Sequence, residues 1–161
     1  MDFFETIGLE RTYTPQHILF LRLALAAVFG AMIGYEREAH GSAGLRTHIL
    51  ISVAAALFTL LAFEIFHISA VMASGRSDPI RAIEAVTAGI AFLGAGAIFQ
   101  QRGSIQGLTT GAGMWLAGAV GVTCALGYYF LAFGVALFAV LVLAALRALT
   151  HREGKSAGRE D

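Results

Sequence analysis

Five long apolar segments dominate this sequence and constrain its fold more than any other feature. They cover residues 18–35, 49–66, 82–99, 108–126 and 128–146, and each is 18 or 19 residues long. A helix rises about 1.5 Å per residue and the hydrocarbon core of a bilayer is about 30 Å thick, so each segment is long enough to cross a membrane. The sequence therefore predicts an all-α integral membrane protein, a bundle of about five transmembrane helices. Only Gly127 separates the last two segments, which leaves a re-entrant fourth segment as an alternative.

The overall composition agrees with a lipid environment and excludes several other classes of protein. Hydrophobic residues make up 57% of the chain and charged residues 14%, whereas soluble domains have about 45–50% and about 25%. The 11 basic residues are balanced by 11 acidic ones, so the positive excess that nucleic acid requires is missing. The single cysteine, Cys124, cannot form an internal disulfide. The five histidines show no metal-binding spacing. We therefore expect no enzymatic activity, no cofactor, no metal site and no nucleic-acid partner.

The positions of lysine and arginine between the segments predict how the chain is inserted, because short loops rich in these residues stay in the cytoplasm. With the C-terminus inside, seven of them lie on the cytoplasmic side and three on the outer side. The predicted organisation is an extracytoplasmic segment 1–17, a transmembrane domain 18–149 and a short cytoplasmic tail 150–161.

Glycine is frequent within the predicted spans, with 19 in the whole chain. Because lipid tails give no hydrophobic force between helices, close approach at small residues drives their association. We expect these glycines to pack the chain's own bundle, with a contact between subunits of a homo-oligomer as the alternative. The candidates are Gly30, Gly34, Gly89, Gly94, Gly96, Gly107 and Gly111.

Three ionisable residues lie inside spans toward the outer side, namely Arg22, Glu64 and Glu84. An ionised group near lipid must find a partner, water or a shallow depth. Two readings are open: either a glutamate pairs with Arg22 across helices, or the long side chains extend to the interface. Nearby, Asp78 followed by Pro79 is typical of a helix start, with Asp78 as the N-cap and Arg81 close enough to bond the same carboxylate.

A second polar group is expected on the cytoplasmic side, where charged residues connect the first two spans and two threonines open the fourth. Either the threonine hydroxyls meet the charged cluster, or they only satisfy backbone groups at a helix end. Together with the outer group, the candidate functional residues are Glu36, Arg37, Arg46, Thr47, Asp78, Arg81, Glu84, Thr109 and Thr110.

Five motifs in this chain resemble those of the MgtC/SapB family of bacterial inner-membrane proteins. They are GYER at 34–37, AGLRTH at 43–48, DPIR at 78–81, FLGAG at 92–96 and GLTT at 107–110, with Trp115 following. The resemblance implies a multi-pass protein of about five spans. Characterised members of the family support growth at low magnesium and survival inside host phagocytes, and at least one is described as restraining the F-type ATP synthase.

The chain departs from the family pattern in two places. Ala85 and Ala88 stand where the family has glutamine and serine, while Glu84 supplies an acid. Only 11 residues follow Thr150, so the chain resembles short members without the soluble C-terminal domain of the larger ones.

The resemblance and the glycine-rich helices together predict a regulatory or interaction role linked to magnesium limitation or membrane energetics. The partners expected are the lipid bilayer and another membrane complex, with ATP synthase implied by the resemblance. The alternative is an ion carrier or channel for magnesium. Mg²⁺ prefers several oxygen ligands, and Glu64, Asp78 and Glu84 are the acids that the outer side offers.

Overall fold

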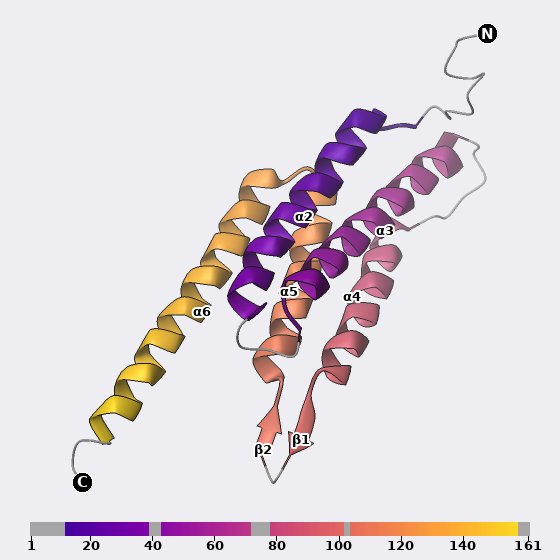
Figure 1. Ribbon diagram of the computed structural model, residues 1–161. Helices are drawn as coiled ribbons and strands as arrows, with labels where there is room; N and C mark the ends of the chain where they lie inside the picture. The colour runs from indigo at the N-terminus through magenta and orange to yellow at the C-terminus, as the bar shows by residue number, and fades with distance from the viewer. Residues whose placement is uncertain (1–11, 39–42, 72–77, 102–103, 158–161) are drawn as a thin grey trace.

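Helices running in alternating directions make up most of the computed structural model, which describes residues 12–38, 43–71, 78–101 and 104–157 (Figure 1). In these residues there are five helices, α2 (Gln16–Glu38), α3 (Leu45–Val71), α4 (Pro79–Gly96), α5 (Leu108–Ala125) and α6 (Tyr129–Ala157). The predicted all-α class is confirmed. Parts of the predicted N-terminal segment and tail, residues 1–11 and 158–161, lie outside the described residues.

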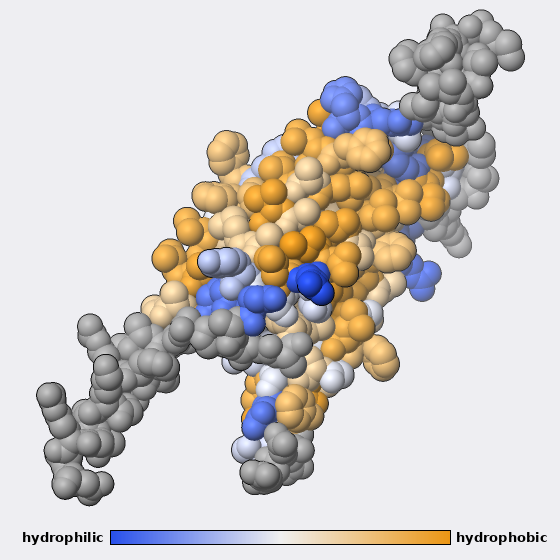
Figure 2. All heavy atoms as spheres, in the orientation of Figure 1, coloured by the Kyte–Doolittle hydropathy of each residue, from blue (hydrophilic) through white to orange (hydrophobic). Residues whose placement is uncertain are grey.

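Four of these helices, α2 to α5, are long and apolar enough to cross a membrane. The apolar part of α6 that the structure describes, Tyr129–Ala145, has 17 residues. Many large apolar side chains point outward, and Phe130, for example, is 95% exposed. Figure 2 shows hydrophobic residues covering the middle of one face of the bundle, with hydrophilic residues nearer the two ends of α2. Such an apolar exterior requires lipid around it, so the chain is a membrane protein.

A short hairpin between α4 and α5 was not predicted. The third apolar segment was expected to continue to Phe99, but α4 ends at Gly96 and the chain turns into β1 (Phe99–Gln101) and β2 (Ser104–Gln106). The strands are antiparallel, with Phe99 opposite Gln106. The prediction failed because a short strand with apolar residues has the same composition as the end of an apolar helix.

Gly107 joins this hairpin to α5. It is the N-cap of α5 with a φ of 84°, in the left-handed region. A methyl group there would collide with the carbonyl oxygen of Ala97. Glycine is therefore needed for both the conformation and the space, and the structure places Gly107 at a helix start.

The turn from α5 to α6 uses a second glycine in the left-handed region, Gly127, with a φ of 84°. Before Gly127, α5 is one continuous helix of 18 residues. After Gly127, α6 runs back in the opposite direction (Figure 1). The short separation between the two apolar segments is therefore a tight turn between antiparallel helices.

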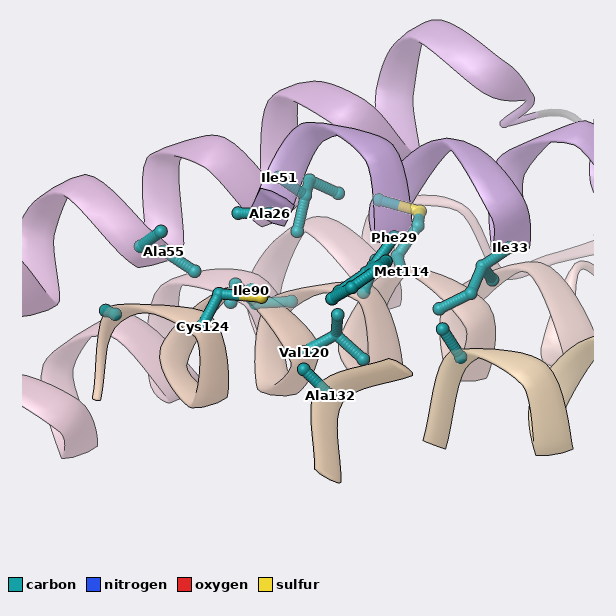
Figure 3. Packing of buried hydrophobic residues seen from close by; sticks show 14 of the residues in the cluster. Ala26, Phe29, Ile33, Ile51, Ala55, Ile90, Met114, Val120, Cys124 and Ala132 are labelled. Carbon is teal, nitrogen blue, oxygen red and sulfur yellow. The ribbon is translucent and has the colours of Figure 1, made fainter. Parts of the chain in front are cut away.

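The core lies around α5, which packs against each of the other four helices. In the span of α5, 56% of the residues are buried, compared with 11% in the span of α4. Figure 3 shows side chains from all five helices meeting in this core. Its residues are mostly small, including Ala26, Ala117 and Cys124, so the helix backbones approach closely. The Ser52 hydroxyl donates a hydrogen bond from α3 to the Ala26 carbonyl of α2 at 2.8 Å.

Four of the glycines predicted to pack helices lie at such close approaches. A methyl group at Gly30 would lie 2.7 Å from the Ser52 Cβ, and one at Gly34 would lie 2.8 Å from the Leu45 Cα. Gly94 and Gly111 face each other between α4 and α5, where an added methyl group would lie 3.0 to 3.3 Å from the opposite carbonyl oxygen. The α2–α3 and α4–α5 contacts therefore depend on glycine.

Gly89 and Gly96 are different. A methyl group at either would have no other atom of the described chain within 4 Å, and both residues are exposed. Their predicted role in packing stays a prediction.

Candidate functional site

The alternating helix directions gather the predicted polar residues at two ends of the bundle. At one end α2 finishes at Glu38, and α3 and α5 begin; we call this the Arg37 end. At the other, here the Asp78 end, α4 begins and α5 passes into α6. The structure therefore separates the nine candidate polar residues into the two groups that the sequence indicated.

At the Arg37 end, Arg37 joins α2 to α5. It is buried, with 8% of its surface exposed. Its Nη2 donates to the Thr110 hydroxyl at 3.4 Å, and its Nη1 lies 3.9 Å from Glu36 Oε2. Of the two readings left open, the structure supports contact between a threonine and the charged cluster, through Thr110. A buried guanidinium is costly in a protein that lipid surrounds, so ionisable groups at such positions are candidates for function.

His48 is a member of this cluster that sequence reasoning missed. It lies on α3, is fully buried, and its Nδ1 is 2.8 Å from the Gly44 carbonyl oxygen. That carbonyl can only accept, so Nδ1 carries a proton, and whenever the ring is neutral its lone pair is at Nε2. The signal available in the sequence was its position four residues after Gly44, which is one helical turn.

Two nitrogens of this cluster, His48 Nε2 and Arg37 Nε, have no hydrogen-bond partner within the described part of the chain. Both side chains lie against Gly113 of α5, where a methyl group would be 3.0 Å from His48 Nε2 and 4.0 Å from Arg37 Cγ. Buried polar groups without partners are rare and are a recognised mark of functional sites. The cluster formed by Arg37, His48, Thr110 and Glu36 is therefore the candidate site at this end.

The other candidates at the Arg37 end lie outside this cluster. Arg46 and Thr109 are exposed, and Thr47 is half-buried. Glu38, which was not a candidate, accepts a hydrogen bond from the Leu45 backbone amide. It therefore caps the start of α3, where backbone amides have no partner within the helix.

At the Asp78 end, Asp78 has the structural role that its sequence context indicated. Its Oδ1 accepts a hydrogen bond from the Ile80 amide at 2.9 Å, and Pro79 is the first residue of α4. Arg81 and Glu84 are exposed. No bond between the Arg81 side chain and the Asp78 carboxylate appears in the described residues.

Of the two readings that the sequence left open, pairing of Arg22 with a glutamate is not seen among the described residues, because Arg22 and Glu64 each bind backbone atoms. Arg22 Nη1 donates to the Ala125 carbonyl oxygen at 2.7 Å, and its Nε lies 3.4 Å from the Tyr129 hydroxyl. The guanidinium therefore caps the C-terminal end of α5, where free carbonyls and the helix dipole favour a cation.

Glu64 binds the backbone of the segment that leads into α2. Its two carboxylate oxygens accept from the amides of Tyr13 at 2.7 Å and Thr14 at 3.0 Å. The Tyr13 ring also stacks on His67, with centroids 3.6 Å apart. Arg22 and Glu64 thus form hydrogen bonds with backbone groups and not with each other.

Comparison with known proteins decides the family. The model of the MgtC family matches residues 23–152, most of the chain. The chain belongs to the MgtC family. Members that it resembles include Protein MgtC of Brucella abortus (strain 2308), 40% identical over 130 residues, which cover 80% of this chain and 51% of that protein. The putative magnesium transporter YhiD of Escherichia coli (strain K12) is 38% identical over 133 residues, which cover 82% of this chain and 62% of that protein.

A third MgtC relative is Protein MgtC of Salmonella typhimurium (strain 14028s / SGSC 2262). It is 36% identical over 110 residues, which cover 68% of this chain and 44% of that protein. This MgtC family chain therefore spans 44–62% of the length of these relatives. No solved structure matches it.

Proposed function

We propose that this MgtC family chain is a regulatory or interaction protein of the bacterial inner membrane, without enzymatic activity of its own. It acts by contacting another membrane protein complex. Family membership supports a link to magnesium limitation or membrane energetics, and the family resemblance makes ATP synthase the first partner to test.

The observation that carries this proposal is that three charged residues of the helices bind the chain itself. Arg22 and Glu64 are bonded to backbone atoms, and Arg37 is bonded to Thr110. A carrier would need such side chains to face a shared aqueous cavity and exchange their partners for an ion. Here they stabilise helix ends and a helix contact instead, which leaves the outer surface for function.

That surface includes a groove between α3 and α4 that suits a transmembrane helix of a partner. Its volume is about 630 Å³ and its lining is almost entirely apolar. Ala54 and Ala55 of α3 and Ala85 and Gly89 of α4 are among the lining residues. Small residues allow the close backbone approach on which helix association in lipid depends. We therefore propose this groove as the place where a partner helix binds.

The proposal is tested by capturing the tagged chain from native membranes and measuring the stoichiometry of co-purified proteins. Ala54→Phe fills the groove, while Ala24→Phe places the same side chain on an exposed position of α2. We expect one partner at fixed stoichiometry with wild type and Ala24→Phe, and its loss with Ala54→Phe. Recovery of no stoichiometric partner, or equal recovery with both variants, would contradict the proposal.

A magnesium carrier is the second candidate, and the name of the Escherichia coli relative, putative magnesium transporter YhiD, favours it. Asp78 offers a clean test, because asparagine caps a helix as well as aspartate but lacks the charge that Mg²⁺ binding uses. Cells that depend on this chain for growth at limiting magnesium should grow normally with Asp78→Asn if it acts by protein contact. Failure to grow, with normal protein in the membrane, would favour the carrier.

We also propose that the Arg37 end faces the cytoplasm, with the N-terminus outside, from the excess of lysine and arginine on that side. Ser104 in the hairpin provides the probe, in a chain whose native cysteine is replaced by alanine. A membrane-impermeant thiol reagent should label Ser104→Cys only after the cells are opened. Labelling of intact cells would reverse the orientation.

A further inference from the structure

One face of α4 carries a regular seam of residues that no other part of the described chain covers. The seam consists of Arg81, Glu84, Ala88, Ala91 and Ala95, which follow one another at intervals of three, four, three and four residues. All five are exposed. The buried residues of α4, Ile90 and Gly94, lie outside the seam. An alternation of three and four residues is the pattern by which two helices pack along their length.

The residue types along this seam suit a contact between helices in lipid. Three of the five are alanines, which allow two backbones to approach closely. Leucine and phenylalanine, which suit contact with lipid tails, occur on α4 outside the seam, at Phe92 and Leu93. The seam is therefore distinct from the rest of the exposed surface of α4.

Its first two residues carry opposite charges that the chain does not neutralise. Neither the Arg81 nor the Glu84 side chain makes a hydrogen bond or an ion pair with the described residues. Both lie within the apolar span of α4, where an uncompensated charge is costly. A partner that covers this face must bring an acid within reach of Arg81 and a base within reach of Glu84.

A second copy of the same helix supplies both, and we propose that two copies of this chain pair through the α4 seam. Copies inserted in the same direction are related by an axis along the membrane normal, so their α4 helices run parallel. In a parallel seam, Arg81 of one copy lies one layer from Glu84 of the other, and the symmetry repeats this pair. The three alanines, which follow Glu84 toward the C-terminal end of α4, then form the close contact between the two helices. This pairing uses a different side of α4 from the groove proposed for a partner, and does not depend on that proposal.

Cysteine cross-linking in native membranes tests the pairing. Starting from a Cys124→Ala chain, single cysteines replace Ala88, Ala95 or, as the control, Leu93. Leu93 is 52% exposed but lies away from the seam, in the wall of the α3–α4 groove. A disulfide needs Cβ atoms about 3.5–4.5 Å apart, so only the seam positions should cross-link efficiently.

The expected product is a disulfide-linked species of twice the chain's 17.0 kDa, for Ala88→Cys and Ala95→Cys. Co-expression of copies with tags of two sizes identifies it as two copies of this chain. Cross-linking of Leu93→Cys to the same extent, or no cross-linking at the two seam positions, would overturn the proposal. So would a product that contains a different protein.

Charge reversal tests the ionic part separately, with the cross-linked fraction of Ala95→Cys as the readout. Arg81→Glu alone and Glu84→Arg alone should each weaken the association by about five- to tenfold, the effect of losing the two symmetry-related polar contacts between helices in lipid. The two together should restore it. Arg81→Gln and Glu84→Gln, singly and together, provide a milder set if a reversed charge prevents insertion. Unchanged cross-linking in the single variants, at equal amounts in the membrane, would overturn the pairing of these two residues.

Discussion

Replacing Gly121 with alanine tests most sharply whether α3 and α5 pack as closely as the structure shows. A methyl group there would collide with the carbonyl oxygen of Ser52. It would also lie 2.9 Å from the carbonyl carbon and 3.0 Å from the Cα of Ser52. These are backbone atoms of α3, so no side chain can rotate away and the two helices must separate. Overpacking of this kind costs about 1–3 kcal/mol, and we expect the upper part of the range.

The same substitution at Gly89 is the matched control, because a methyl group there meets no atom of the described chain within 4 Å. In both helices alanine is favoured over glycine by about 0.8–1.0 kcal/mol. The net effect is therefore a loss of about 2 kcal/mol at Gly121 and a gain of up to about 1 kcal/mol at Gly89, a difference of about 3 kcal/mol.

The assay is thermal unfolding of both purified variants in one detergent, followed by the fraction that elutes as folded protein after heating. In a chain of this size 1 kcal/mol shifts the midpoint by about 2–4 °C, so the two midpoints should differ by about 6–12 °C. Equal midpoints, or a lower midpoint for Gly89→Ala, would refute the reasoning from packing.

Three further substitutions follow from the hydrogen bonds at the helix ends. Arg22→Gln should lower stability by about 1.5–3 kcal/mol, the value of a hydrogen bond to a charged group, whereas Arg46→Gln, at an exposed position, should change it by no more than about 0.5 kcal/mol; thermal unfolding measures both. Thr110→Val removes the hydroxyl that contacts the buried guanidinium of α2 and should cost about 1–3 kcal/mol. In the same assay Thr109→Val, at an exposed position, is expected to be nearly neutral. Glu64→Ala should speed hydrogen exchange at the two backbone amides that precede α2, and unchanged exchange would contradict the bond that the structure shows.

The helices could be predicted from the sequence because their length and apolar character leave few alternatives in a membrane. The separation of Asp78 and Arg37 to opposite ends also followed, since antiparallel helices alternate the position of their loops. The start of α4 was predictable for a local reason, the aspartate and proline that begin it. These features depend on residues near one another in the sequence or on the thickness of the bilayer.

The remaining features depend on contacts that have no local signature. Arg22 and Glu64 bind backbone groups far away in the sequence, and a backbone carbonyl or amide cannot be recognised from residue type. The burial of His48 depends on Gly113 of a different helix, and its position one turn after Gly44 was the only indication. The hairpin escaped prediction because Phe99 extends the apolar segment without continuing the helix.

Magnesium flux through the purified protein tests the central claim most directly. Proteoliposomes that enclose a magnesium-sensitive dye would be prepared with the wild-type chain and with Asp78→Asn, alongside liposomes without protein. We predict that Mg²⁺ enters the two protein preparations no faster than the empty liposomes, because Arg22, Glu64 and Arg37 are bonded to the chain itself. Saturable uptake by the wild type that Asp78→Asn abolishes would show that the chain carries the ion, and would contradict a function through protein contact alone.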